Sequence, residues 1–526
     1  MVYVRPEMRA RWWSLAALLA ALTALAVWRA ACVRAGPDID TDAYAHHAIA
    51  RQIAADPRDL GAHWVWLPLF HFAQLPLVLA GGTMEHVRWA NVALTALLPI
   101  VLFAYVRRTA RPGAAGVPAD VTALVAALVA AACPVAMQMG TTAQPEPLFA
   151  LLALGVAISF ERRRDVAAAV MLGTAVLLRY EAWAVVAAAA AALAVERARA
   201  RGGRAGVAAV GGGRAWVVVA VPVALILGWA ALRRPVDGQW FGFLRQTHEF
   251  ATGALPGAAA ADHGFGQRAL WLARDLLFYP VFVAARALGP ALAFVPFGVA
   301  RTVREQGGRF TLVLLACLGF VSLSWATRSS LGLDRHFVAV VPLYATFAAQ
   351  GLSAAADARA RAAGRAAGEA RERSAVVTSI AAGRTVGAAL AFAVIAGLGV
   401  ELVVWMGSWR ASIARGWPDR SALGAYLRSL PGTPTVFCDD ATLEILSGLD
   451  RRRFDRHWVD DPHTWALVEE AARERGTVYV ATWRRKLRGH EPPGRLVFEA
   501  GGDPADAEGS GVAVLRVAAD ESRSQR

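Results

Sequence analysis

Long apolar runs, separated by short clusters of arginine, constrain this chain more than any other feature of its sequence. A helix needs about 20 residues to cross a hydrocarbon core of about 30 Å. Runs of suitable composition lie at about 12–33, 87–106, 118–137, 146–160, 166–179, 182–195, 215–232, 284–300, 310–326, 336–353 and 385–406. The sequence therefore predicts a polytopic α-helical membrane protein with about eleven transmembrane helices. We expect the two short runs, 146–160 and 166–179, to extend into their flanks or to be shielded by neighbouring helices.

The charge of the chain follows these apolar runs. Its 526 residues are 56% hydrophobic and carry a net charge of +14. Nearly all basic residues are arginine, with Lys486 the only lysine, and many of them lie in short loops between apolar runs. Such loops determine membrane topology. We therefore expect the positive charge to orient the protein in membrane lipids and expect no nucleic-acid partner. The richness in arginine, alanine and glycine indicates a high-GC bacterial genome.

The arginine clusters agree on one orientation. If the N-terminus is cytoplasmic, the clusters at 5–11, 107–111, 162–164, 197–214, 301–309 and 359–384 all lie on the cytoplasmic side. The loops of the opposite side are 34–86, 233–283 and 327–335, and they carry mixed charge. This pattern predicts an odd number of spans in the bacterial inner (plasma) membrane and places the chain after about residue 407 in the periplasm.

The chain divides into regions of different composition. We expect a transmembrane module at 1–353 with its first outer loop at 34–86, a cytoplasmic Arg/Ala-rich linker at 354–384, a last transmembrane helix at 385–406 and a periplasmic domain at 417–526. In the last region, apolar segments at 435–438, 477–481 and 511–517 alternate with helix-like segments at 442–446 and 463–475. This alternation predicts a small α/β domain. It contains neither a GxGxxG motif nor a P-loop, so nucleotide binding is unsupported.

Three aspartates, Asp38, Asp40 and Asp42, directly follow the first predicted span. Carboxylates at a bilayer surface are costly to desolvate, so they usually serve chemistry, binding or topology. From Asp40 to about Ala54 the chain reads as an amphipathic helix, with Asp40 or Thr41 as its N-cap and Asp56-Pro57 as its end. Its apolar positions allow it to lie on the membrane surface. We expect Asp38 to stay in water.

These carboxylates have three interpretations. Asp40 or Asp42 is suited to act as a general base that takes a proton from an attacking hydroxyl. Two carboxylates with His46, which shares a helix face with Asp42, are also suited to hold a divalent cation. The third interpretation is structural, with the acids capping the helix and facing water. The four cysteines form no CxxC pair, so neither a zinc site nor a disulfide framework is expected.

Further polar residues lie at membrane interfaces on the same predicted side. Trp66 belongs to a Trp-Pro segment that anchors at the interface or lines a substrate site. Glu146 begins an apolar run, where the helix N-terminus favours a carboxylate. Arg179 and Glu181 stand between two apolar runs and need partners, either each other or a substrate. Arg335, followed by His336, is suited to bind a lipid phosphate, and its alternative is an internal ion pair.

In order and position these segments resemble the GT-C membrane glycosyltransferases, which include protein O-mannosyltransferases and the aminoarabinose transferase of lipid A. The resemblance covers about residues 10–355. It rests on Asp40-Thr41-Asp42-Ala43-Tyr44, Trp66-Leu67-Pro68-Leu69, Gln144-Pro145-Glu146-Pro147-Leu148-Phe149, Leu178-Arg179-Tyr180-Glu181-Ala182-Trp183 and Arg335-His336-Phe337-Val338-Ala339-Val340-Val341-Pro342-Leu343.

The resemblance implies an enzyme that moves a sugar from a polyprenyl-phosphate donor to a glycan, lipid or protein acceptor on the periplasmic face, with inversion. It implies that Asp40 or Asp42 is the base and that Arg335 holds the donor phosphate. The usual adjacent acidic pair is here Asp-Thr-Asp, so the matching aspartate stays open. Tyr44, His46, Trp66, Glu146, Arg179, Glu181 and His336 complete the expected substrate site. The alternatives are a transporter or lipid flippase, whose acids would lie within spans, and a non-catalytic relative.

Overall fold

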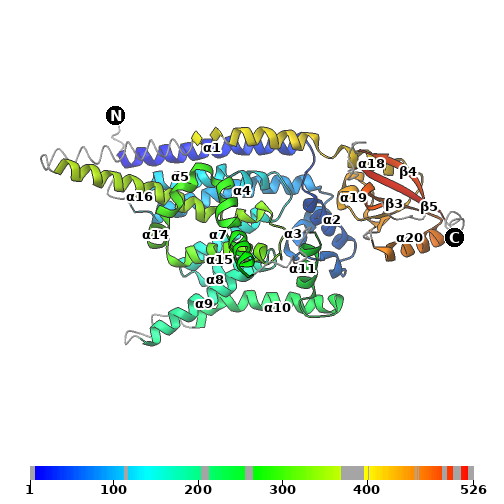
Figure 1. The fold of residues 1–526 in the computed structure, drawn as a ribbon, viewed down its shortest axis with the longest axis horizontal. Helices are drawn as coiled ribbons and strands as arrows, with labels where there is room; N and C mark the ends of the chain where they lie inside the picture. The colour runs from blue at the N-terminus through cyan, green and yellow to red at the C-terminus, as the bar shows by residue number, and fades with distance from the viewer. Residues whose placement is uncertain are drawn as a thin grey trace. The chain divides into compact units, whose positions relative to one another are not determined.

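The computed structural model describes residues 6–111, 117–202, 213–254, 265–368, 396–397, 399–400, 402–455, 459, 461–487, 494–501 and 511–518. The chain forms two compact units (Figure 1). The first comprises residues 1–32, 63–70 and 88–409, and the second comprises 33–62, 71–87 and 410–526. Of the predicted linker, 369–384 lies outside the described residues, as does much of the predicted last span, 385–406.

The first unit is a helical bundle. Its helices are α1 (Pro6–Ala35), α4 (Met84–Thr109), α5 (Ala119–Ala132), α6 (Pro134–Met139), α7 (Glu146–Glu161), α8 (Asp165–Val176), α9 (Glu181–Gly202), α10 (Val217–Asp237), α11 (Gly242–Ala254), α12 (Phe265–Leu276), α13 (Ala284–Leu288), α14 (Val295–Gln306), α15 (Gly308–Ala326) and α16 (Val341–Gly368). Short 3₁₀ or π turns precede α10, α13, α14 and α16: η2 (Gly213–Trp216), η3 (Phe278–Val283), η4 (Gly289–Phe294) and η5 (Asp334–Val340).

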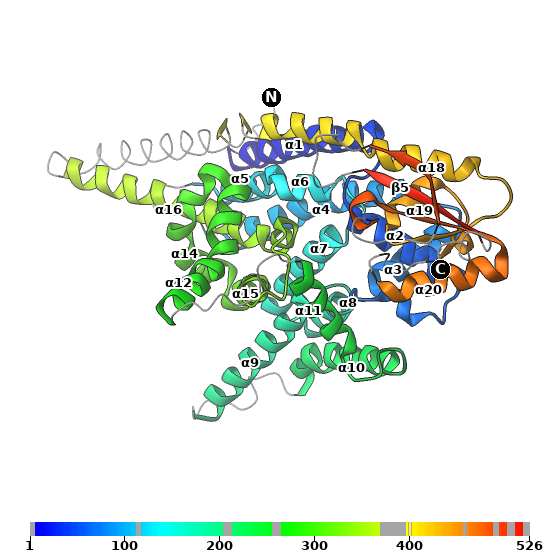
Figure 2. The ribbon, with the colours of Figure 1, turned by 45° about the vertical axis from the view of Figure 1, so that its right-hand side comes forward.

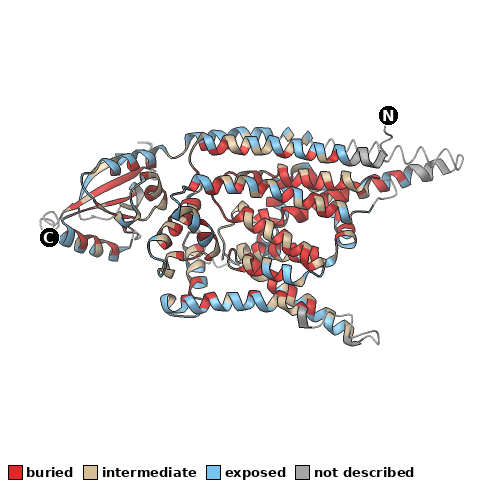
Figure 3. Cartoon of the chain, turned by 180° about the vertical axis from the view of Figure 1, so that it is seen from behind, coloured by how far each residue is buried: buried red, intermediate tan, exposed pale blue. Residues whose placement is uncertain are grey.

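The bundle has the composition of a membrane protein. Among the described residues, 6 helical stretches are long and apolar enough to cross a bilayer: Trp12–Ala35, Met84–Thr109, Val217–Asp237, Ala269–Gln306, Gly308–Ala326 and Asp334–Ala362. The most apolar window of the last stretch is 94% buried, whereas that of Val217–Asp237 is 28% buried and shows an exposed apolar surface (Figure 3). The polytopic helical fold is thus confirmed, and the count of eleven spans stays a prediction.

Two predicted spans are interrupted. The run 118–137 is divided between α5 and α6, because Pro134 opens α6 and Cys133 before it has an extended ψ of 119°. A proline disfavours helical backbone at the residue that precedes it. The run 284–300 is divided between α13, η4 and α14, since Gly289 has φ 49° and ψ −131° and Pro290 follows it. Both breaks leave polar backbone that must be satisfied inside the protein.

Helices α14 and α16 touch through their backbones. A Cβ atom built on Gly298 would lie 1.8 Å from the carbonyl oxygen of Phe347, and one built on Gly351 would lie 1.9 Å from that of Phe294. Small residues that permit such an approach are typical of helix pairs in membranes. The bundle core therefore depends on glycine at these two positions.

Replacement of Gly298 by alanine is expected to lower the unfolding temperature in detergent, because the added methyl group forces two backbones apart at a cost of about 1–3 kcal/mol. Thermal unfolding followed by tryptophan fluorescence measures the effect. Gly319→Ala in α15 is the matched control, since no heavy atom lies within 4 Å of its added Cβ. Equal unfolding temperatures for Gly298→Ala and the wild type would contradict the close packing.

The second unit contains a five-stranded sheet covered on both faces. The strands are β1 (Thr435–Cys438), β2 (Phe454–Asp455), β3 (Thr477–Trp483), β4 (Arg495–Ala500) and β5 (Val512–Ala518), in the order β2-β1-β3-β5-β4. Strands β2, β1 and β3 are parallel, and β5 pairs antiparallel with β3 and β4. Helices α18 (Pro418–Ser429) and α19 (Ala441–Ser447) cover one face and α20 (Pro462–Arg475) the other (Figure 2).

Side chains that alternate along the strands supply two separate cores. Val436 and Cys438 pack with Leu423 of α18, whereas Phe437 between them packs with Val468 of α20. This is the side-chain alternation of a strand buried on both faces. The predicted α/β domain is confirmed. Strands β2 and β4 were not predicted. Strand β2 has only two residues, and β4 is largely exposed, with polar ends that hide the strand pattern.

Most of the segment predicted as the first outer loop, 33–62 and 71–87, belongs to the same compact unit as this domain. It supplies α2 (Thr41–Ala55) and most of α3 (Leu69–Leu79), with η1 (Leu60–His63) between them. Helix α2 packs on α19: Arg51 donates to the carbonyl oxygen of Leu449 at 3.0 Å, and Arg451 donates to the side chain of Gln52 at 3.0 Å. Both arginines lie within 3.7 Å of the buried carboxylate of Glu444. These contacts fix the helix that carries the acidic segment.

Candidate functional site

The acidic segment is ordered by its own backbone. Asp38 is 1% exposed, so the expectation that it stays in water is wrong. Its carboxylate accepts from the backbone N–H of Asp40 at 3.0 Å, and its carbonyl oxygen accepts from the Tyr44 hydroxyl and from the indole of Trp417, each at 2.8 Å. Trp417 comes from the C-terminal region, and no local signal predicts that it lies beside Asp38. Asp38 therefore shapes the turn that leads into α2.

Asp40 and Asp42 occupy different positions on α2. Asp40 is the N-cap, with extended backbone, and its side chain accepts from the backbone N–H of Asp42 at 3.0 Å. An N-cap carboxylate satisfies a donor that the helix leaves unpaired. Asp42 lies in the first turn, where the helix dipole favours its negative charge. Both residues are half-buried. The predicted helix and the predicted cap are confirmed.

Tyr44 and His46 lie inside the second unit rather than on a membrane surface. Tyr44 is 0% exposed and His46 is 3% exposed. The Nδ1 atom of His46 lies 2.9 Å from Nε2 of His71, and the neighbouring His47 lies 3.0 Å from the side-chain oxygen of Gln74. The expected membrane-facing apolar side of α2 is in fact packed against α3 and α19. His71 and Gln74 were not identified as site residues, because only the fold brings them to α2.

The metal interpretation gains no support from this arrangement. Among the described residues, three histidine, cysteine, aspartate or glutamate side chains do not come together anywhere in a geometry suited to an ion. His46 pairs with a second imidazole, and Asp40 pairs with backbone. The contact of Asp40 caps a helix, and that of His46 packs α2 on α3.

The first unit brings four of the predicted site residues together. Arg179 donates to Glu146 at 2.8 Å and to Glu181 at 2.7 Å. Arg335 lies 3.5 Å from the same oxygen of Glu146 that Arg179 contacts. The two glutamate side chains are 3% and 5% exposed, and the two arginine side chains are 15% and 13% exposed. This Arg/Glu cluster is neutral as a whole, but its accessible atoms are mostly those of the arginines.

Residues that the sequence did not single out hold this cluster in place. The loop before Glu146 is fixed by Arg88, which donates to the carbonyl oxygen of Thr141 at 2.7 Å. Asn91 donates to the carbonyl oxygens of Thr142 and Gln144, each at 2.7 Å. Both side chains come from α4 and are buried. The sequence does contain a signal for these two residues, because an arginine and an asparagine inside an apolar run require internal partners.

Arg335 and His336 lie in η5, directly before α16. The backbone N–H of His336 donates to the carbonyl oxygen of Leu333 at 3.2 Å. Asp334 beside them pairs with Arg286, whose side chain is 61% exposed. Asp334 is therefore paired with Arg286, whereas Arg335 lies at the Arg/Glu cluster.

The segment before α3 turns sharply at an aromatic cluster. Trp64 has a positive φ of 47° and packs edge-on against Trp66 and Phe250, with ring centres 5.5 and 5.0 Å apart. Its carbonyl oxygen accepts from Arg233, which pairs with Asp237 in the interior of the unit. A non-glycine residue with positive φ persists only where its surroundings hold it. Trp66 thus sits in a rigid aromatic corner of the first unit.

His63 is expected to make the protein acid-sensitive. Burial, and then the charge of Arg233, lower the pKa of His63 to about 3. The folded protein therefore favours neutral His63, so its contribution to stability is complete above about pH 6.5 and is lost as the pH falls from there toward 3. The loss reaches up to about 1.4 kcal/mol per pH unit.

Denaturant unfolding at pH 7, 6 and 5 measures this effect. The free energy of unfolding should depend less on pH for His63→Gln than for the wild type. His248 is exposed, so His248→Gln is the control and should match the wild type. Identical slopes for all three proteins would refute this role.

The chain is similar to known proteins in its three-dimensional structure but matches none in the sequence comparisons. Neither a protein-family model nor a curated protein matches the chain. The fold of the chain, with its interrupted helical bundle and its small sheet, is similar to that of solved structures. One solved protein of this fold is ArnT from Cupriavidus metallidurans. The ArnT structure bound to undecaprenyl phosphate has a TM-score of 0.58 at 14% identity, and the apo structure has 0.57 at 13%. Both matches cover 96% of this chain and 98% of ArnT. The GT-C resemblance of the sequence is therefore confirmed at the level of the fold.

Proposed function

We propose that this protein is an integral membrane glycosyltransferase, which moves a sugar from a polyprenyl-phosphate donor to an acceptor hydroxyl with inversion at the anomeric carbon. The observation that carries the proposal is the likeness, over nearly the whole chain, to an ArnT structure bound to undecaprenyl phosphate. The Arg/Glu cluster supports it, because it offers arginine beside carboxylates in the first unit. A donor of this kind is anionic at its phosphate and neutral along its tail.

Arg335 is the residue that we assign to the donor phosphate. Guanidinium groups bind phosphate oxygens through paired, charge-assisted hydrogen bonds. The phosphate gains negative charge as the bond to the sugar breaks, so a preformed cation stabilises the transition state more than the ground state. Arg179 is held by two glutamates, and we assign to Arg179, Glu146 and Glu181 the orientation of Arg335 and of the sugar hydroxyls. His336 and Trp66 are assigned to substrate contact as well.

Asp42 is the residue that we assign as the base. The acceptor oxygen attacks the anomeric carbon, the bond from that carbon to the phosphate oxygen breaks, and the acceptor proton passes to the carboxylate. Asp40 is the runner-up, but its carboxylate already caps α2. Tyr44 and His46 are buried in the second unit, so we assign them to positioning of α2 rather than to substrate contact.

The location and the acceptor follow from the predicted topology. With the N-terminus in the cytoplasm and eleven spans, the acidic segment and the C-terminal α/β domain lie in the periplasm of a bacterial inner membrane. The acceptor is then a glycan, lipid or protein of the cell envelope, and the donor sugar a hexose or pentose, as in mannosyltransferase-like enzymes. The four-region division of the chain, 1–353, 354–384, 385–406 and 417–526, is part of this proposal.

A deletion strain tests the proposed function. Envelope glycans, lipid A and glycoproteins of the deletion strain are compared with those of the parent by mass spectrometry, with plasmid-borne wild type, Asp42→Asn and Asp40→Asn as the complementing genes. Loss of one sugar, restored by the wild type and by Asp40→Asn but not by Asp42→Asn, is the expected result. Restoration by Asp42→Asn as well would show that Asp42 is not the base. Restoration by Asp40→Asn in addition would favour a transporter, a flippase or a non-catalytic relative, because none of these needs a base.

A further inference from the structure

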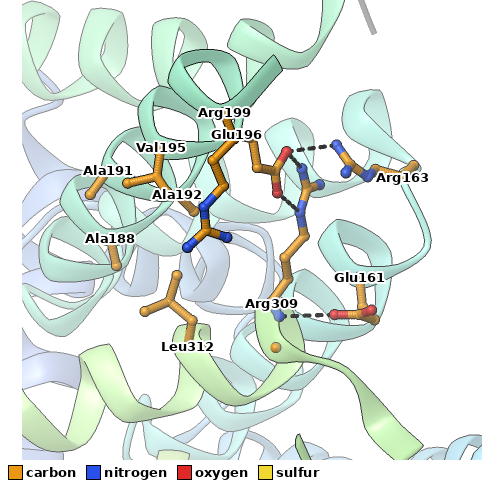
Figure 4. Close-up of a pocket in the computed structure, with 11 residues that line it drawn as sticks. Glu161, Arg163, Ala188, Ala191, Ala192, Val195, Glu196, Arg199, Arg309 and Leu312 are labelled. Atoms are coloured by element: carbon orange, nitrogen blue, oxygen red, sulfur yellow. Dashed lines mark hydrogen bonds and ion pairs between the residues drawn. The ribbon is translucent and has the colours of Figure 1, made fainter. Parts of the chain in front are cut away.

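A groove lies in the first unit at the end of the bundle that is rich in arginine. Its volume is about 580 Å³, and it runs between α9 and α15 beside the turn that joins α7 to α8 (Figure 4). Helix α9 supplies most of its wall through residues three or four apart, so that one face of the helix lines the groove: Ala188, Ala191, Ala192, Val195, Glu196 and Arg199. The remaining wall comes from Glu161, Arg163, Gly308, Arg309 and Leu312.

The long wall of the groove is apolar and open. It consists of alanines, Val195 and Leu312, and Val195 is 48% exposed. The small alanine side chains are what leaves the space between the two helices. In a bilayer, an open apolar groove along a membrane helix is filled by a hydrocarbon chain, because water there would leave its hydrogen bonds unmade.

The carboxylates at the polar end of the groove are already bound. Glu161 accepts from the backbone N–H groups of Arg309 and Phe310 at 2.9 and 3.1 Å, which caps the start of α15. Glu196 accepts from Arg309 at 2.8 Å and from Arg163 at 3.0 Å (Figure 4). These contacts fix the positions of two arginines at the polar end. With two glutamates and three arginines, this end of the groove has an excess of positive charge.

Arg199 carries that excess charge. It lies one turn beyond Glu196 on α9, and its guanidinium points back along the groove toward Leu312 (Figure 4). Arg199 is exposed, and within the described part of the chain it forms no ion pair or hydrogen bond. A long cationic side chain above an apolar wall combines the two features of a lipid headgroup site, since its charge meets the phosphate where the acyl chains begin.

We propose that this groove binds one anionic phospholipid of the surrounding bilayer, with its phosphate on Arg199 and an acyl chain along the alanine wall of α9. The charge selects an anionic headgroup, and the length of the apolar wall selects a lipid rather than a free anion. The site involves neither the acidic segment nor the Arg/Glu cluster. It therefore stands independently of the proposed glycosyl transfer.

Native mass spectrometry of the full-length protein in a neutral detergent tests the site. Phosphatidylglycerol and phosphatidylcholine with the same acyl chains are titrated separately against the wild type, Arg199→Ala and Arg197→Ala. Arg197 is the matched control because it is an exposed arginine on the same helix that does not line the groove. We expect the wild type to bind phosphatidylglycerol more tightly than phosphatidylcholine. Arg199→Ala should weaken phosphatidylglycerol binding about fivefold, and Arg197→Ala should leave it unchanged.

A substitution that fills the groove tests the binding of the acyl chain separately from the binding of the headgroup. Ala192→Leu should weaken the binding of both lipids, because the added side chain occupies the position of the acyl chain, whereas millimolar inorganic phosphate should not displace phosphatidylglycerol. The proposal is overturned if Arg199→Ala binds phosphatidylglycerol like the wild type, or if Arg197→Ala loses as much affinity as Arg199→Ala. Displacement by inorganic phosphate would show an anion site instead, and preference for undecaprenyl phosphate over phosphatidylglycerol would assign the groove to the donor lipid.

Discussion

Replacement of Asp42 by asparagine is expected to lower the rate of sugar transfer by about 10²- to 10⁴-fold, which is the usual contribution of a positioned general base. The amide cannot take the acceptor proton, while its size and its place in the first turn of α2 are preserved. The fold should survive, because α2 is held through Tyr44, His46 and Arg51 and not through Asp42 alone. Initial rates of polyprenyl phosphate release by purified protein measure the effect.

Asp40→Asn is the matched control for that experiment. Asparagine caps helices about as well as aspartate, so this change removes a charge two residues away and keeps the hydrogen bond to the backbone of Asp42. We expect its rate to stay within a few-fold of the wild type. If Asp40→Asn is inactive and Asp42→Asn is active, the base is Asp40, and if both are fully active, the acidic segment has no catalytic role.

Replacement of Arg335 by alanine is expected to lower kcat/KM for the lipid donor by about 10²- to 10³-fold, the cost of removing one donor to a developing negative charge. The local structure should persist, because Glu146 keeps its 2.8 Å ion pair with Arg179 when Arg335 is absent. Arg335→Lys should recover part of the loss, since an ammonium supplies charge but not the planar pair of donors. Steady-state kinetics at varied donor concentration measure both variants.

Arg286→Ala controls for the general loss of positive charge near this segment. Arg286 is exposed and pairs with Asp334, next to Arg335 in the chain, so its removal changes the net charge equally without touching the Arg/Glu cluster. It should keep kcat/KM within a few-fold of the wild type. A loss as large as that of Arg335→Ala would mean that long-range electrostatics, and not a bound phosphate, explain the effect.

Local signals predicted parts of this molecule well. The N-cap at Asp40 and the Asp56-Pro57 stop predicted a helix to about Ala54, and the helix ends at Ala55. The sequence also named an ion pair as one alternative for Arg179, which is in fact bound by Glu146 and Glu181. Such features depend on residues close in the chain or on the strong requirement of a buried charge for a partner.

Contacts between residues far apart in the chain could not be predicted from the sequence. Asp38 is buried, and Trp417, 379 residues later in the chain, donates a hydrogen bond to its carbonyl oxygen. Nothing in the composition of the first outer loop indicated that α2 packs on α19 of the C-terminal domain. The C-terminal domain therefore has a structural role that the sequence did not predict: it holds α2, the helix that carries the acidic segment. Arg451 and Glu444 are the residues that make this link to α2.

The stereochemistry of one turnover tests the proposed sugar transfer. Purified wild type and Asp42→Asn are incubated with a polyprenyl-phosphate sugar of known anomeric configuration and an envelope acceptor, and the product is analysed by NMR while polyprenyl phosphate is quantified by mass spectrometry. For inverting transfer with Asp42 as the base, we expect a product of inverted configuration and one polyprenyl phosphate released per sugar transferred, with Asp42→Asn slower by about 10²-fold or more. A product of retained configuration, or equal rates for the two proteins, would contradict this mechanism.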